Sequence, residues 1–122
     1  MTLNLIFKHD NLIFLSGLMV GLVFFVFPLL GFDLKYFPGD FGDGRLNIYF
    51  LEHSYKFLTF KLENSFWDAP FMYPAKGVLA YSDNLLGSAP IYGFFRLLGF
   101  NVFTSFQCWY IAVSVLNYYC AY

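Results

Sequence analysis

The chain has 122 residues, of which 59% are hydrophobic and 25% aromatic, and only 12% carry a charge. A soluble domain usually has about a quarter charged residues, and one small core could not hide 18 Phe and 10 Tyr. The formal net charge of −1 argues against a nucleic-acid partner, which would require clustered Lys and Arg. The composition therefore indicates a membrane protein of at most one domain, with the lipid bilayer as a partner.

The first apolar stretch follows a short arm, residues 1–10, and predicts a transmembrane helix. Residues 11–32, NLIFLSGLMVGLVFFVFPLLGF, contain no charge. About 20 apolar residues at ~1.5 Å each match the ~30 Å hydrocarbon core of a bilayer. Lys8 and the terminal amine place the arm in the cytoplasm by the positive-inside rule. Within the span, Gly17 and Gly21 have the spacing of a GxxxG helix-packing motif, which also arises by chance.

Residues 33–99 carry most of the charges and prolines, and by this topology they form an extracytoplasmic loop. After the turn PGDFGDGR, the pattern at about 44–62 predicts a helix with aromatic residues on one side and charged residues on another. Such a helix would lie along the membrane surface or cap a helical bundle. Cap residues and a proline predict two shorter interfacial helices, at 83–87 and 90–98.

A second uncharged apolar run, residues 100–122, is long enough to return the chain to the cytoplasm, although Asn101, Gln107 and Asn117 make it more polar. No Lys or Arg marks its end, and polar side chains in both spans favour further helix partners. We therefore expect an all-α membrane protein with two transmembrane helices and a helical extracytoplasmic loop. It would be a fragment of a larger, multi-pass fold.

Candidate site residues gather after the first span and on the helix that follows it: Asp40, Asp43, Arg45, Glu52, His53 and, further along, Asp83. Carboxylates at a membrane surface can serve as a general base or bind Mg²⁺, Mn²⁺ or Ca²⁺ through oxygen. Structural alternatives stay open at this point. Asp43 is also a plausible helix N-cap, Asp40 a turn residue, and His53 a packed member of an aromatic helix face.

Four segments resemble the amino-terminal part of bacterial GT-C glycosyltransferases, multi-span membrane enzymes that use lipid-linked sugars: GDFGDGRLNIYFLEH, FWDAPFMYP, LAYSDNLLGSAPIY and FQCWYIAVSVLNYYCAY. The resemblance covers about residues 11–122. It implies that Asp40 or Asp43 is the base that deprotonates an acceptor hydroxyl, or a ligand for a divalent cation such as Mg²⁺ or Mn²⁺. Arg45 would counter the donor phosphate. Asp83 would add a second carboxylate, with Glu52 and His53 as further substrate-binding candidates.

The resemblance implies a segment of an inner-membrane glycosyltransferase that uses a polyprenyl-phosphate sugar at the extracytoplasmic face. Such an enzyme has many more spans, so we expect the 122-residue chain to be inactive alone. Two other readings remain. One is a small non-enzymatic membrane protein or subunit that acts through its spans and aromatic loop. The other is a truncated gene remnant.

Overall fold

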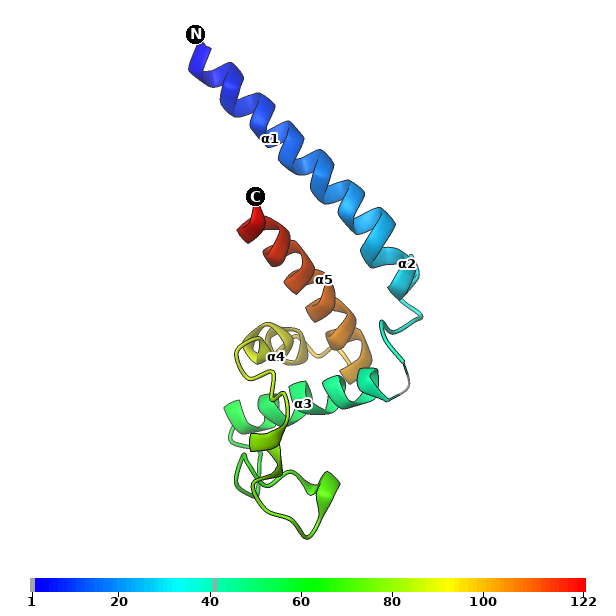
Figure 1. Cartoon of the computed structure of the whole chain (residues 1–122), viewed down its shortest axis with the longest axis vertical. Coiled ribbons are helices and arrows are strands. Elements are labelled where there is room, and N and C mark those ends of the chain that lie inside the picture. Colours follow the sequence, from blue (N-terminus) through cyan, green and yellow to red (C-terminus); the bar gives the residue numbers. More distant parts are fainter. Residues whose placement is uncertain (1, 41) are drawn as a thin grey trace. The chain divides into compact units, whose positions relative to one another are not determined.

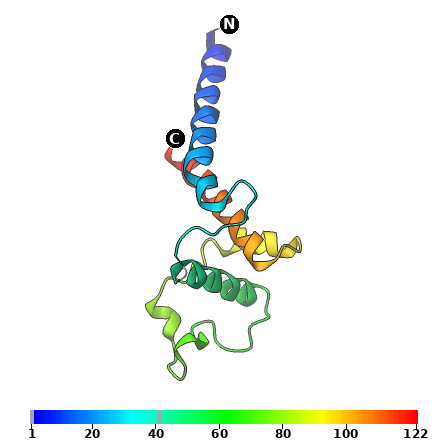
Figure 2. The ribbon, with the colours of Figure 1, turned by 90° about the vertical axis from the view of Figure 1, so that its right-hand side faces the viewer.

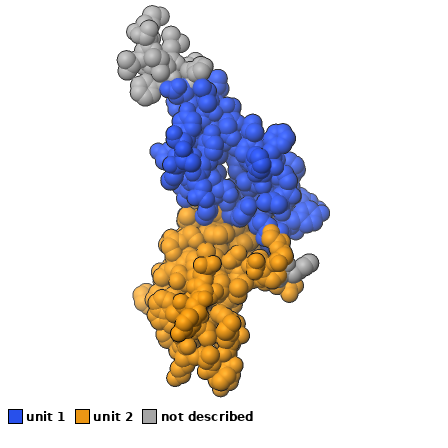
Figure 3. Space-filling model, in the orientation of Figure 1, with its two compact units in different colours: residues 1–38, 110–122 blue, residues 39–109 orange. Residues whose placement is uncertain are grey.

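A computed structural model describes residues 2–40 and 42–122, with side chains from residue 10 onward. The described chain is all-helical, as the sequence predicts, with 65% helix and no strand among these residues (Figures 1 and 2). It divides into two compact units, shown in Figure 3. Unit 1 comprises residues 1–38 and 110–122, and unit 2 comprises residues 39–109.

The first helical run belongs to unit 1 and begins inside the expected arm. It consists of α1 (Thr2–Gly21), a π-helical turn η1 (Leu22–Val26) and α2 (Phe27–Leu30). The widened π-turn lies directly before Pro28, which lacks an N–H and crowds the carbonyl four residues back. The run ends at Gly31, whose φ of 72° is a conformation that glycine adopts without the cost of a side chain.

One helix in the described part of the chain, Asp10–Leu30, is long and apolar enough to cross a membrane. Its most apolar window has a mean hydropathy of 2.6, and only 6% of that window is buried inside the protein. Phe24 and Phe25, for example, are 68% and 73% exposed. The core helix of a soluble protein would be mostly buried, whereas a signal sequence has the same length, composition and position.

The expected second span forms a helix, α5 (Val102–Ala121), but it does not meet the same test of length and apolar composition. Part of its polarity has a structural use. The Asn101 side chain accepts the Thr104 N–H at 2.8 Å and so caps the helix. Ser105 and Gln107 are buried within unit 2, to which the first part of α5 belongs. A second membrane crossing therefore remains a prediction.

Within unit 1, α1 packs on the end of α5 through aromatic side chains. The Tyr118 hydroxyl donates to the Phe14 carbonyl at 3.2 Å, and the Tyr122 hydroxyl donates to the Asp10 carbonyl at 3.2 Å. A Cβ at Gly17 would meet the Tyr118 ring, with Cζ at 3.2 Å and the hydroxyl closer still. A Cβ at Gly21 would have nothing within 4 Å. Of the two glycines in the GxxxG spacing, only Gly17 is therefore at a close contact in this unit.

Unit 2 is built around α3 (Asp43–Leu58), which ends four residues before the expected boundary at residue 62. Two clusters of buried side chains cover different sides of this helix: Phe50, Phe66, Ala69, Val78 and Leu79 in one, and Leu51, Tyr55, Ala89, Tyr92 and Phe106 in the other. The first cluster joins α3 to the loop that follows it, and the second joins it to α4 (Ala89–Leu97) and the start of α5. Phe50 and Tyr55 of α3 are thus covered within unit 2, whereas Leu46 and Phe57 stay exposed, and the position of this helix at a membrane surface stays a prediction.

The loop after α3 contains two short 3₁₀ turns, η2 (Pro70–Met72) and η3 (Val78–Tyr81). The helix expected at 83–87 is wrong, because these residues form an irregular segment followed by a turn. The Asn84 side chain accepts the Leu86 N–H at 3.0 Å, which offers the backbone an alternative to the helix. Leu85 adopts a φ of 51°, outside the right-handed helical region.

Candidate functional site

The acidic turn before α3 is organised by Asp40. One of its carboxylate oxygens, Oδ1, accepts the Gly42 N–H at 2.9 Å and the Asp43 N–H at 2.6 Å. Its backbone carbonyl accepts the Gly44 N–H at 3.2 Å. These are the free N–H groups at the start of a helix, so Asp40 performs the capping role that the sequence offered to Asp43.

Asp43 is the first residue of α3, and its side chain is exposed. In the described part of the chain, its carboxylate has no hydrogen-bond or ion-pair partner. A carboxylate in the first helical turn interacts favourably with the positive end of the helix dipole. Arg45 is exposed on the same turn. Asp43 is therefore the acidic residue of this turn that is open to a ligand.

The two carboxylates of the turn do not by themselves make a ligand set for the divalent cation that the sequence suggested. One oxygen of Asp40 is already occupied by two backbone N–H groups. Over the residues that the structure describes, no three His, Cys, Asp or Glu side chains gather where they could hold a metal ion. Mg²⁺ and Ca²⁺ typically take about six or more oxygen ligands, with water or substrate supplying the remainder.

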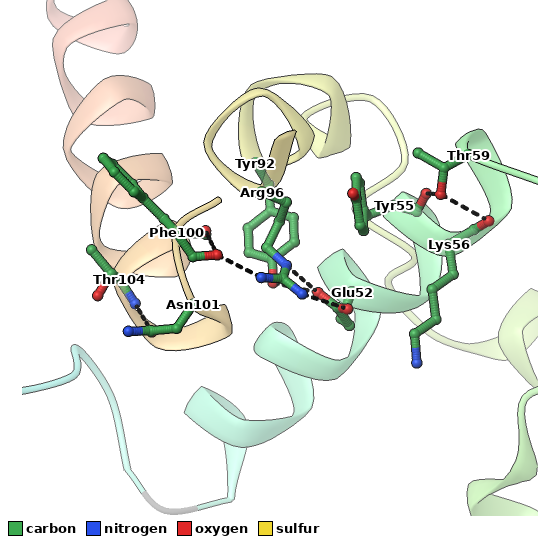
Figure 4. Close-up of polar contacts among 10 residues, drawn as sticks. Glu52, Tyr55, Lys56, Thr59, Tyr92, Arg96, Phe100, Asn101 and Thr104 are labelled. Atoms are coloured by element: carbon green, nitrogen blue, oxygen red, sulfur yellow. Dashed lines mark hydrogen bonds and ion pairs between the residues drawn. The ribbon is translucent and has the colours of Figure 1, made fainter. Parts of the chain in front are cut away.

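Glu52 faces α4, where it meets Tyr92 and Arg96 (Figure 4). The Tyr92 hydroxyl donates to Glu52 Oε2 at 2.7 Å, Arg96 Nε donates to the same oxygen at 3.0 Å, and Arg96 Nη2 donates to Oε1 at 3.3 Å. The Arg96 and Glu52 side chains are only 21% and 18% exposed. A two-point contact of this kind fixes the orientation of both partners.

Within this cluster the charges of Glu52 and Arg96 compensate one another. Burial raises the pKa of Tyr92, and the hydrogen bond to Glu52 raises it further. Burial alone would lower the pKa of Arg96, but the hydrogen bond and charge of Glu52 outweigh it and the pKa is raised. Arg96 also lies over the Tyr55 ring, 5.6 Å from its centroid. Glu52 is thus part of an internal clamp between α3 and α4, and its role in substrate binding stays a prediction.

His53, the next residue, makes a different contact. Its side chain is 6% exposed, and Nε2 lies 2.8 Å from the Phe66 carbonyl. Because a carbonyl only accepts hydrogen bonds, Nε2 must carry the proton and donate it. The ring stacks on Tyr49 at 5.7 Å. His53 therefore fastens α3 to the loop, in keeping with the alternative that it is a packed residue.

Asp83 lies exposed in the extended segment after η3. The structure thus brings Asp40 and Asp43 together in one turn and gives Glu52 and His53 separate partners. Arg96 and Tyr92 were missed by the sequence analysis, although one signal was present. Arg96 is the only charged residue after Asp83, and a lone charge in an apolar stretch requires a partner.

A cavity of about 350 Å³ lies beside the end of α3 and was also not anticipated. Its walls carry charges of both signs, from Glu52, Lys56, Lys61, Glu63 and Asp68. Tyr49 also lines it, and the buried Tyr49 hydroxyl has no hydrogen-bond partner among the residues that the structure describes. Burial raises the pKa of this phenol. Asp68 is already engaged, because it accepts the Gly77 N–H at 2.7 Å and closes the loop that contains η2.

Comparison of the chain with protein-family models, curated proteins and solved structures found no match. The likeness to GT-C enzymes therefore stays a prediction from the four sequence segments. What the residues themselves establish is an all-helical chain with one exposed apolar helix and a separately packed unit that begins at an acidic turn.

Proposed function

We propose that the chain is the amino-terminal part of a GT-C-like integral membrane glycosyltransferase. It would transfer a sugar from a polyprenyl-phosphate donor at the extracytoplasmic face of the bacterial inner membrane. The helical run from α1 to α2 would cross the bilayer with its N-terminus in the cytoplasm, unit 2 would lie outside, and α5 would lead the chain back. Further transmembrane helices would complete the donor and acceptor sites.

The environment of the Asp10–Leu30 helix supports membrane insertion. Only 6% of its apolar window is buried by the rest of the protein, and most of its side chains are exposed, so they would face water in a soluble chain. Exposing so long an apolar surface is unfavourable, whereas a bilayer accepts it and the helix satisfies its own backbone. A signal sequence shares this composition but would leave unit 2 without an anchor at its N-terminal side.

The difference between Asp40 and Asp43 carries the catalytic part of the proposal. A general base needs a carboxylate that an acceptor hydroxyl can approach within hydrogen-bond distance. Asp40 uses Oδ1 to hold the turn, while the Asp43 carboxylate is exposed and has no partner in the described chain. We therefore assign the base to Asp43 and a positioning role to Asp40. Arg45, exposed on the same turn, is the candidate to pair with a donor phosphate.

The test replaces each aspartate by asparagine in the full-length gene product, reconstituted in liposomes with polyprenyl-phosphate-linked hexoses. Asp43→Asn should lower transfer about 10²–10⁴-fold, the usual contribution of a general base, while membrane insertion is unchanged. Asp40→Asn should lower transfer less and also lower stability, because the turn loosens. Asp33→Asn is the matched control, since Asp33 is an exposed aspartate outside unit 2 that pairs with Lys35.

Wild-type rates in Asp43→Asn would remove this residue from the site. Wild-type protein that is folded and inserted but transfers none of the hexoses would favour the non-enzymatic membrane protein.

A further inference from the structure

The α4 helix has a buried face that accounts for all of its polar side chains. Ala89, Tyr92 and Gly93 are buried against α3, and a Cβ at Gly93 would lie 3.2 Å from the Tyr55 ring. The Tyr92 hydroxyl and the Arg96 guanidinium both turn inward to Glu52 (Figure 4). No polar side chain of α4 remains for its outer face.

The outer face of α4 is apolar throughout. Phe94, Leu97 and Leu98 are 57%, 72% and 58% exposed. The patch continues through Phe100 and Phe103, 40% and 55% exposed, to the start of α5. From residue 90 to residue 100, every exposed side chain is apolar. A helix on the surface of a soluble protein shows the opposite arrangement, with its apolar stripe inward and its polar face outward.

The α3 helix of the same unit provides the contrast. Its exposed positions include three charged residues, Asp43, Arg45 and Lys56, beside three apolar ones, Leu46, Phe57 and Leu58, while Phe50 and Tyr55 are buried. The exposed surface of α3 is therefore mixed. The two helices pack on one another, so unit 2 presents a surface that carries charges along α3 and an uncharged, apolar surface along α4.

We propose that the outer face of α4, with Phe100 and Phe103, is a lipid-contacting surface of unit 2, seated in the acyl-chain region of the bilayer. It rests on the proposed function only for the membrane insertion of the chain, not for glycosyl transfer. Two observations favour lipid over a protein partner. The patch is continuous with α5, whose sequence stays uncharged to its last residue. Of the exposed side chains from residue 90 to residue 103, Asn101 alone is polar, and its oxygen already accepts the Thr104 N–H, so the patch offers few groups for the hydrogen bonds of a typical protein interface.

A lipid contact of α4 also explains why Arg96 pairs with Glu52. An arginine on a helix in contact with lipid is costly unless it turns away from the acyl chains and finds a counter-charge. Arg96 does both, because it bonds Glu52 on α3 and the Phe100 carbonyl. The clamp therefore allows α4 to be apolar outward while it carries one charge.

The test uses site-directed spin labels, whose collision rates with oxygen and with a nickel chelate distinguish lipid, water and protein surroundings. Leu97→Cys, Leu98→Cys and Phe94→Cys are made in a Cys108→Ala/Cys120→Ala background of the full chain and reconstituted in phosphatidylethanolamine–phosphatidylglycerol vesicles. Phe60→Cys, at a 96% exposed apolar site of the same unit, is the matched control. Phe24→Cys, at a 68% exposed site of η1 in the same helical run as α1, is the reference for a membrane-inserted helix.

Labels at 94, 97 and 98 should collide more with oxygen than with the nickel chelate, as the label at 24 should, while the label at 60 should show the reverse. A predominance of nickel collisions at 97 and 98 would mean water and overturn the proposal. Low collision rates with both reagents would mean a protein cover and would also overturn it. Nickel collisions at position 24 would mean that the first helical run is not inserted in the membrane. Nickel collisions at 97 and 98 alone would overturn only the lipid contact of α4.

Discussion

Unit 1 and unit 2 treat their apolar side chains in opposite ways. In unit 1, the helical run of α1 and η1 leaves Leu12, Phe24 and Phe25 more than half exposed. In unit 2, α3 is covered on two sides by buried clusters and tied to its neighbours by the polar contacts of Glu52 and His53. Unit 2 thus has a core of its own, whereas most of the large apolar side chains of the first helical run in unit 1 stay exposed. Substitutions that affect one unit and spare the other test this difference.

The largest effect is expected at the ion pair of unit 2. Arg96→Met would leave the Glu52 carboxylate 18% exposed and without its charge partner. Breaking a fully buried pair costs about 3–5 kcal/mol, and partial exposure reduces this to about 2–3 kcal/mol. The free energy of unfolding of unit 2 can be followed by the fluorescence of Trp67 and Trp109, which both lie in it.

Lys76→Met, at an exposed loop position, is the control for Arg96→Met and should change the free energy of unfolding by less than about 0.5 kcal/mol. Equal effects of the two variants would mean that the ion pair does not hold α3 to α4. The double variant Glu52→Gln/Arg96→Met should be more stable than Arg96→Met, since no unpaired charge remains.

Unit 1 should be most sensitive at Gly17. Gly17→Val would place atoms against the Tyr118 ring and separate α1 from α5, at a cost of about 1–3 kcal/mol. Gly21→Val makes the same change of residue on the same helix, at a position where a Cβ has nothing within 4 Å. Thermal unfolding in detergent should show a lower Tm for the first variant only. Equal shifts would show that helix propensity, not the Tyr118 contact, is being measured.

Removal of the Tyr92 hydroxyl should cost about 1–2 kcal/mol, because its hydrogen bond to a carboxylate is charge-assisted and partly buried. The measurement is the denaturant midpoint of Tyr92→Phe. Tyr81→Phe serves as the control at a 92% exposed tyrosine. A midpoint for Tyr92→Phe that matches wild type would place the hydroxyl in water instead of on Glu52.

The free energy of unfolding should also depend on pH through the Tyr92 hydroxyl. The folded-state pKa of Tyr92 is raised above the ordinary value of 10.0 by burial and by Glu52. The folded protein therefore keeps this proton when the unfolded chain releases it. The contribution of the protonated Tyr92 hydroxyl to the free energy of unfolding is present below pH 10. It is lost as pH rises from 10 toward the folded-state pKa, by about 1.4 kcal/mol per pH unit at most. Tyr92→Phe should flatten this fall, and an unchanged slope would contradict it.

The smallest effect expected is at the turn before α3. Asp40→Ala removes the side chain that accepts two backbone N–H groups and should cost about 1 kcal/mol. Asp43→Ala removes only a favourable interaction with the helix dipole, roughly 0.3–1 kcal/mol. The free energies of unfolding of the two variants are measured in parallel. If Asp43 were the capping residue, Asp43→Ala would cost more than Asp40→Ala.

The sequence predicts the helices well where periodicity or apolar length is strong. The all-helical class follows from composition, and the patterns of α1, α3, α4 and α5 are visible in the residues. The helix expected at 83–87 was wrong because the Asn84 side chain bonds the backbone locally. The burial of Phe50 on α3 could not be predicted, because Val78 and Leu79, which help to cover it, lie 20 or more residues beyond the end of α3.

For the candidate site, the sequence indicates the residue types better than their positions relative to one another. The pattern GDFGDGR identifies two aspartates but cannot say which one caps the helix, since that depends on the backbone path between them. Glu52 and His53 are neighbours in sequence, yet a helix turns by about 100° per residue, so they point to different partners. The lone charge of Arg96 was a readable signal for a buried pair, but its partner 44 residues away was not.

Membrane insertion of the helical run from α1 to α2, with unit 2 outside the cytoplasm, is tested most directly by the accessibility of a single cysteine. Lys56→Cys, at an exposed position of α3, is labelled in spheroplasts with a membrane-impermeant maleimide, in a Cys108→Ala/Cys120→Ala background, with Phe24→Cys in η1 for comparison. We expect labelling at position 56 without permeabilisation and no labelling at position 24. Labelling at position 56 only after permeabilisation would place the acidic turn on the cytoplasmic side and contradict the proposed topology.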